Sequence, residues 1–139
     1  MARRWKVAID CADPDGLAAF WAAALEYRLL EAPDGHASWA EYSRTVATRP
    51  GEAWTVIVDP DGRGPSLLFH GVPESKVVKN RLHLDVQAPK DTPGDRRQQV
   101  DTEVQRVVGL GARKLHDVTD DAGYFVVMED PEGNEFCIG

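Results

Sequence analysis

Two residues of this chain have the types and settings that proton transfer and anion binding require. His83 lies in an alternating run, residues 82–86, and an imidazole exchanges protons near neutral pH. Lys6 lies in a similar run near the N-terminus and would bind an anionic group if it were partly desolvated. The alternatives are a hydrogen-bonded strand histidine and an exposed lysine at a strand start. His83 is therefore a candidate general base or substrate anchor, and Lys6 a candidate anion ligand.

Aromatic and acidic residues extend this set. Trp39 and Trp54 lie in predicted strands, where they could stack on a planar ligand, although core packing is the better interpretation for Trp54. Glu135 alternates with Cys137 in the last strand, so the two side chains share one face. A carboxylate at Glu135 either joins the same site or points into solvent.

The hydrophobic pattern predicts the elements that position these residues. Asp13 followed by Pro14 begins a helix of about three turns that ends near residue 26, and a second helix is predicted over residues 95–110. Period-two alternation and turn signals predict the strands. These strands are 5–11, 28–31, 37–42, 54–58, 66–70, 82–86, 113–116, 124–129 and 135–138.

Each half of the chain therefore has the order β-α-β-β-β, which indicates an internal duplication. Residues 6–13 align with 83–90 at an offset of 77, residues 25–30 with 110–115 at 85, and residues 54–62 with 125–133 at 71. The third pair includes the same turn, Asp-Pro-acid-Gly, in both halves. Three blocks in the same order are unlike a chance repeat.

Composition limits the partners and the compartment. The 139 residues suit one domain, and 16 basic against 23 acidic side chains give a net charge of −7, which disfavours nucleic acid and anionic membranes. No apolar run is long enough to cross a membrane and no secretory segment is visible, so we expect a cytoplasmic protein. In that reducing compartment we expect Cys11 and Cys137 to be two buried thiols and not a disulfide, and the lack of CxxC spacing disfavours a structural zinc site.

The chain resembles the vicinal oxygen chelate superfamily, which includes glyoxalases, bleomycin and fosfomycin resistance proteins and extradiol dioxygenases. The resemblance is carried by residues 13–21, 79–85 and 128–137 and extends over about 5–138. It implies an α+β fold in a single glyoxalase-like domain, residues 1–139. Module 1 (about 5–72) and module 2 (about 80–139) would be βαβββ units forming a curved-sheet half-barrel cup, often within a homodimer. This fold hosts many reactions, so the resemblance does not identify one.

The resemblance also implies where a divalent metal would bind, namely at the first and last strands of each module. The first-strand positions are Lys6, which cannot ligate while protonated, and His83, which can. The last-strand position of module 2 is Cys137, and that of module 1 falls near 68–70, where His70 is the one residue able to ligate. No cofactor is therefore predicted. A metal, if bound, would use His83, Cys137 and His70.

Two functional hypotheses from different classes follow. The first is a metal-free protein that sequesters or recognises a planar, hydrophobic or anionic small molecule. The second is a metal-dependent lyase, isomerase or dioxygenase using His83 with Cys137, His70 or Glu135. Ligand-position chemistry favours the first, whereas the abundance of enzymes in the family that the chain resembles favours the second, and whether any reaction is catalysed stays open. The predicted site comprises six residues: Lys6, Trp39, His70, His83, Glu135 and Cys137.

Overall fold

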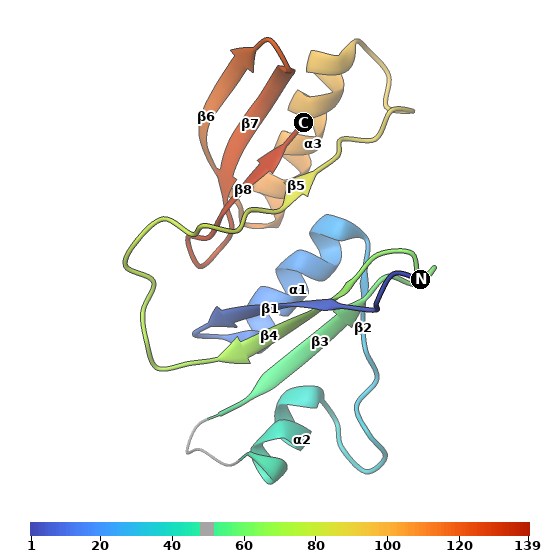
Figure 1. Ribbon diagram of the computed structural model, residues 1–139, viewed down its shortest axis with the longest axis vertical. Coiled ribbons are helices and arrows are strands. Elements are labelled where there is room, and N and C mark those ends of the chain that lie inside the picture. Colours follow the sequence, from blue (N-terminus) through green and yellow to red (C-terminus); the bar gives the residue numbers. More distant parts are fainter. Residues whose placement is uncertain (48–51) are drawn as a thin grey trace. The chain divides into compact units, whose positions relative to one another are not determined.

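The computed structural model describes residues 1–47 and 52–139, and it divides into two compact units (Figure 1). Unit 1 comprises Met1–Ser75 and unit 2 comprises Lys76–Gly139. Each unit holds one four-stranded mixed sheet, which is open at both outer strands and does not close into a barrel. The fold is α+β, with three helices among the described residues. None of these helices is long and apolar enough to cross a membrane.

Unit 1 has the predicted order with one added helix. Its sheet order is β1-β4-β3-β2, in which β1 and β4 are parallel and the other pairs antiparallel. Its elements are β1 (Lys6–Cys11), α1 (Pro14–Leu25), β2 (Arg28–Leu29), α2 (Trp39–Val46), β3 (Trp54–Val58) and β4 (Ser66–Gly71).

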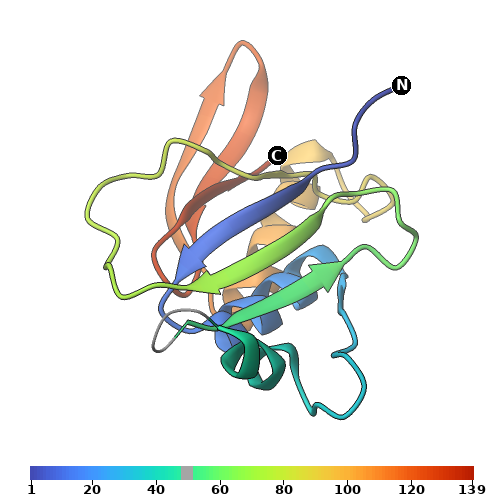
Figure 2. The same cartoon turned by 60° about the horizontal axis from the view of Figure 1, so that its bottom comes forward.

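Helix α1 begins where its sequence predicts. Asp13 is the N-cap, and its carboxylate accepts a hydrogen bond from the Gly16 amide at 3.1 Å. The apolar face, with Phe20 and Trp21 edge to face, is buried against β3 and β4. Figure 2 shows these strands in front of α1, which covers one face of the sheet. Helix α1 therefore covers only one face of β3 and β4, and the side chains on their opposite face point away from it.

The predicted strand 37–42 is wrong, because residues 39–46 form helix α2. Ser38 is its N-cap and accepts a hydrogen bond from the Glu41 amide, while the Glu41 carboxylate accepts one from the Ala37 amide. Ser43, buried on α2, accepts a hydrogen bond from the Trp54 amide and so ties the helix to β3. Local capping thus outweighs the weak alternation of this segment.

Unit 2 repeats the order without an added helix. Its sheet order is β5-β8-β7-β6, with β5 and β8 parallel. Its elements are β5 (Asp85–Val86), α3 (Arg96–Leu110), β6 (Arg113–Asp120), β7 (Gly123–Glu129) and β8 (Glu135–Ile138). Helix α3 begins at Asp95 in a capping box with Gln98 and ends at Gly111, which is left-handed at φ 118°.

Three predicted strands have different lengths in the structure. Strand 28–31 is reduced to β2, and strand 82–86 to β5, because pairing with β8 begins only at the Leu84 carbonyl. Strand 113–116 extends to Asp120 because β6 and β7 form a hairpin whose outer strand is polar and exposed along its length. Backbone pairing, which hydrophobic periodicity does not report, sets these limits.

The registers of the two sheets confirm the internal duplication. Ala8 and Val56 both align with Leu68 in unit 1, as Asp85 and Val127 both align with Cys137 in unit 2. Ala8 and Asp85 are 77 residues apart, and Val56 and Val127 are 71 residues apart, which are the offsets of the aligned sequence blocks. Leu68 is therefore the structural counterpart of Cys137.

The outermost strand pair of each sheet shows the same correspondence between the two units. Arg28 aligns with Val58, and Arg113 aligns with Glu129, so the third sequence offset of 85 also follows the pairing. All three aligned blocks thus correspond to equivalent strands, and the two units are duplicated βαβββ modules.

Candidate functional site

Each sheet has one face that packs against its helix and an opposite face, which we call the open face. In unit 1, Thr55 of β3 donates a hydrogen bond to Asp15 of α1, with 2.6 Å between the oxygen atoms, so Thr55 faces the helix. Because strand side chains alternate, its neighbours belong to the open face. The open face of unit 1 consists of Lys6, Ala8, Asp10, Trp54, Val56, Ser66, Leu68 and His70.

The open face of unit 2 is defined in the same way. Phe136 and Ile138 of β8 are buried, as are Val126 and Met128 of β7, and both strands pack against α3. The intervening side chains form the open face of unit 2, which consists of Asp85, Val127, Glu129, Glu135 and Cys137. Glu135 and Cys137 therefore share a face, as their alternation predicts.

Lys6 and His70 lie toward opposite ends of the open face of unit 1. Lys6 is exposed at the start of β1 and aligns with Ser66, whereas His70 aligns with Asp10 near the end of β1. The four-residue separation of Lys6 and Asp10 corresponds to about 13 Å along an extended strand. Ala8, Leu68 and Val56 fill the row between them and make it apolar.

His70 is held between two carboxylates. Its Nε2 donates a hydrogen bond to Oε1 of Glu52 at 3.0 Å, and its Nδ1 lies 3.6 Å from Oδ1 of Asp10. The His70 and Glu52 side chains are mostly buried, whereas that of Asp10 is 72% exposed. Since a carboxylate only accepts, Nδ1 of the neutral ring is left as a hydrogen-bond acceptor.

Trp39 lies on α2 and is partly occupied by internal contacts. Its indole Nε1 donates a hydrogen bond to the Glu31 carbonyl at 2.8 Å, and its ring packs edge to face on Tyr42. His36 packs on the same tyrosine. Trp39 is thus part of an aromatic cluster that the expected strand would not have formed, and its predicted role in ligand binding stays a prediction.

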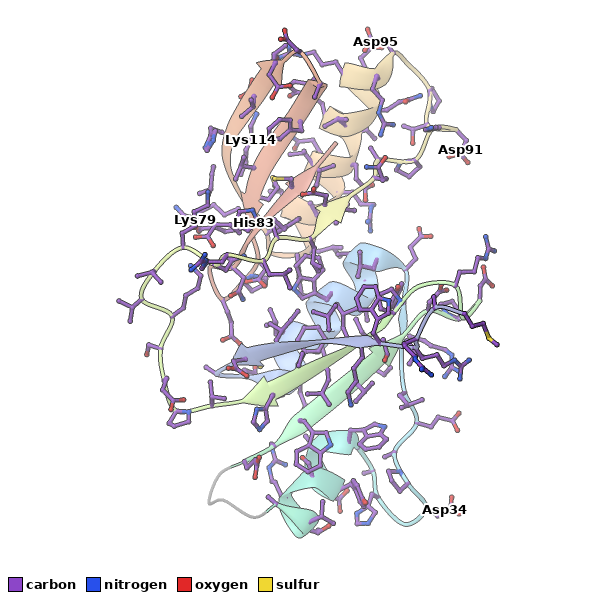
Figure 3. The ribbon with its side chains drawn as sticks, in the orientation of Figure 1. Asp34, Lys79, His83, Asp91, Asp95 and Lys114 are labelled. Atoms are coloured by element: carbon purple, nitrogen blue, oxygen red, sulfur yellow. The ribbon has the colours of Figure 1, made fainter. Side chains whose placement is uncertain are left out.

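His83 is exposed in the segment before β5, near Lys79 (Figure 3). Its Nε2 donates a hydrogen bond to the Asn80 carbonyl at 2.7 Å. The bond fixes the ring through one nitrogen and leaves Nδ1 as the acceptor of the neutral imidazole. Proton acceptance or ligand anchoring at His83 would therefore occur at Nδ1.

The Glu135 carboxylate is occupied by the segment that precedes β5. It accepts hydrogen bonds from Lys76 Nζ and from the Asn80 amide, each at 3.0 Å, while the Asn80 side chain bonds both backbone groups of Glu135. Burial raises the pKa of Glu135, but the Asn80 amide and the Lys76 ammonium outweigh it, so the pKa lies below its usual value. The ionised Glu135 carboxylate therefore holds this segment against the start of β8 through its bonds to Lys76 and Asn80.

Cys137 is a protonated thiol. Burial raises its pKa first, and the neighbouring Asp85 carboxylate, to which the thiol is hydrogen-bonded, raises it further, while Lys79 lowers it. A metal that bound here would have to displace the proton of this thiol. Neither cysteine is in a disulfide among the described residues; Cys11 is buried, whereas Cys137 is only partly buried.

The positions at which the family resemblance places metal ligands do not suit a divalent metal. They hold Lys6, Leu68, His83 and Cys137, since the register makes Leu68 the counterpart of Cys137. An ammonium and an isobutyl group do not ligate, and the thiol is disfavoured. Within the described residues, no group of three or more His, Cys, Asp or Glu side chains has an arrangement that could hold a metal ion.

Sequence reasoning missed three polar residues that shape these faces. Asp10 accompanies His70, Asp85 accompanies Cys137, and Asn80 holds Glu135. Asp10 and Asp85 are signalled by their alternation with Lys6 and His83 in apolar strands. Asn80 has no comparable signal, because it lies outside any strand.

Comparison with known proteins places the chain in a family. A family model described as a glyoxalase-like domain matches residues 6–139. No curated protein matches the chain at a significant level.

Solved structures with this fold cover nearly the whole chain. A glyoxalase/bleomycin resistance protein/dioxygenase family enzyme from Burkholderia phytofirmans PsJN has 16% identity and a TM-score of 0.62, covering 96% of this chain and 94% of its own. A possible glyoxalase from Bacillus cereus has 17% identity and a TM-score of 0.63, covering 99% and 98%.

A third structure with this fold is a variant of the fosfomycin resistance protein FosX from Listeria monocytogenes, complexed with Mn(II) and 1S,2S-dihydroxypropylphosphonic acid. It has 11% identity and a TM-score of 0.66, covering 99% of this chain and 91% of its own. At these identities the three structures establish the fold alone. The family model, which matches residues 6–139, shows that this chain belongs to the family of glyoxalase-like domain proteins.

Proposed function

We propose that this chain is a metal-independent small-molecule-binding protein that recognises or sequesters a planar, anionic or hydrophobic compound. The observation that carries the proposal is the register of the two sheets, which puts Leu68 and Cys137 at equivalent positions and Lys6 on the first strand. A family member that used a divalent metal would need ligands there. An apolar row with a cation at one end instead suits a flat molecule that carries a negative group.

Lys6 is the proposed anion ligand. It is exposed on the open face of unit 1, next to Ala8 and Leu68, whose apolar side chains can contact a ring. His83 belongs to unit 2, so no part of this contact is assigned to it. The Lys6 contact operates over short range, so a net-acidic chain can still select an anion.

The alternative function, a metal-dependent lyase, isomerase or dioxygenase, has less support. It requires His83 with Cys137, His70 or Glu135, yet the thiol is protonated and the carboxylate is bound to Lys76 and Asn80. The manganese-bound FosX variant supports this alternative only through its fold. We therefore assign the chain to the binding class.

Tryptophan fluorescence and calorimetry test the proposal. Planar aromatic carboxylates, starting with 4-methylbenzoate, are titrated into the protein with and without EDTA. We expect binding that EDTA does not change and that Lys6→Ala weakens about ten- to hundredfold, since a charge contact is lost. Lys90→Ala, at an exposed loop lysine, should leave it unchanged. Binding that requires a divalent metal, or that Lys6→Ala does not alter, would contradict the proposal.

A further inference from the structure

Asp10 and His70 present two hydrogen-bond acceptors to the same place on the open face of unit 1. Oδ1 of Asp10 lies 3.6 Å from Nδ1 of His70, which is too far for a direct hydrogen bond. If the ring is neutral, neither atom supplies a hydrogen to the other. A single group that donates two hydrogens would satisfy both.

Glu52 fixes which nitrogen of His70 is the acceptor. Its Oε1 accepts the hydrogen of Nε2 at 3.0 Å, so the neutral ring carries its proton on the side away from Asp10. The Glu52 side chain is 18% exposed and that of His70 is 28% exposed, which restricts movement of the ring. Glu52 is thus a positioning residue for the acceptor pair.

The surroundings of the pair suit a positive charge. Asp10 and Glu52 place two carboxylates around one imidazole, and within residues 1–47 and 52–139 the only ion-pair partner of Asp10 is His70. Trp54 aligns with His70 across β3 and β4 and shares the open face, where an aromatic ring favours a cation. The sequence predicted His70 as a possible metal ligand, but the register makes Leu68 the counterpart of Cys137, so His70 lies two residues beyond that position.

We propose that Asp10 and His70 bind a primary ammonium group of the ligand, which donates one hydrogen to each acceptor atom. The proposal rests on the proposed function and adds the ligand's second charged group. Lys6 binds the anionic end, Ala8 and Leu68 contact the body, and the acceptor pair binds the cationic end. The ligand class is therefore a flat, zwitterionic amine-carboxylate.

Three matched compounds test this inference by calorimetry: 4-(aminomethyl)benzoate, 4-methylbenzoate and benzylamine. The first has both charged groups, the second only the carboxylate and the third only the ammonium. We expect 4-(aminomethyl)benzoate to bind about tenfold or more tightly than either of the others, because each loses one charge-assisted contact. Equal affinity for 4-(aminomethyl)benzoate and 4-methylbenzoate would overturn the inference while leaving the proposed function intact. Failure of both carboxylates to bind would overturn both.

Variants assign the effect to the acceptor pair. Asp10→Asn and His70→Gln remove one acceptor each, since the glutamine amide can still donate to Glu52, and both should abolish the preference for the amine. His70→Asn keeps an oxygen near the place of Nδ1 and should retain most of the preference. The matched control is Asp34→Asn, which removes a carboxylate from an exposed loop before α2 and should change nothing (Figure 3). A preference that survives in Asp10→Asn would contradict the assignment, and Asp10 is exposed enough that this variant should fold.

Discussion

Individual side chains on the open faces determine which chemistry this chain can perform. Cys137 stands where the family resemblance places a metal ligand, but burial and the Asp85 carboxylate keep its pKa above the usual value. Its counterpart Leu68 is aliphatic, and Lys6 is a cation. The carboxylate of Glu135, near these positions, accepts hydrogen bonds from Lys76 and from the Asn80 amide.

The pKa of Cys137 gives a test at this scale. Alkylation by iodoacetamide requires the thiolate, so the rate at Cys137 should rise only at a pH above the usual range of a thiol. Asp85→Asn removes a carboxylate that raises the pKa and should shift the rate profile to lower pH. Lys79→Ala removes a cation that lowers the pKa and should shift it to higher pH.

Peptide mass spectrometry separates Cys137 from the buried Cys11 in these measurements. The same pH profile in wild type and Asp85→Asn would show that Asp85 does not act on the thiol.

The secondary-structure elements could be predicted where capping and hydrophobic periodicity agree. Asp13-Pro14 and Asp95 mark the starts of α1 and α3, and period-two runs mark β1, β3, β4, β7 and β8. The start of helix α2 has a capping sequence, Ser38-Trp-Ala-Glu41, but the weak alternation of the same segment predicts a strand, so the two signals disagree there. The extent of β6 had no hydrophobic signal, since its length depends on hairpin pairing with β7.

The candidate site was less predictable than the fold. Strand alternation gave the shared face of Glu135 and Cys137, because the period of two is fixed by backbone geometry. It could not give the neighbours across the sheet, such as Asp10 beside His70, since those depend on register. The same weak alternation predicts a strand position for Trp39, which is the first residue of helix α2.

The capping box of α3 gives a test at the scale of the element. Asp95 accepts from the Gln98 amide while the Gln98 side chain accepts from the Asp95 amide, so Asp95→Ala leaves helix donors unsatisfied. We expect a loss of about 1 kcal/mol in the free energy of unfolding, measured by urea denaturation. Asp91→Ala, in the exposed loop before α3 (Figure 3), is the matched control and should change stability little. An equal loss in both variants would contradict the capping role.

At the scale of the whole molecule, the two units each leave outer strands at the edges of an open sheet. The outer strands are β1 and β2 in unit 1, and β5 and β6 in unit 2. Edge strands have unpaired backbone groups that a second chain can cover. The charged side chains of β6, including Lys114 (Figure 3), protect that edge, whereas β1 has Ala8 and Ile9 at its centre.

We therefore predict a homodimer, which accords with the resemblance. Multi-angle light scattering at micromolar concentration should give about twice the chain mass of 15.3 kDa. A mass equal to that of one chain would contradict this prediction.

Metal binding is the central difference between the proposed function and its alternative. Untagged protein is incubated with excess Mn(II) or Zn(II), dialysed without chelator and measured by elemental analysis, with His83→Ala in parallel. We predict a metal-to-chain ratio far below one for both metals and no difference between wild type and His83→Ala, because Lys6, Leu68 and the protonated Cys137 supply no ligand. A ratio near one in the wild type that is lost in His83→Ala would contradict the account and favour the metal-dependent enzyme.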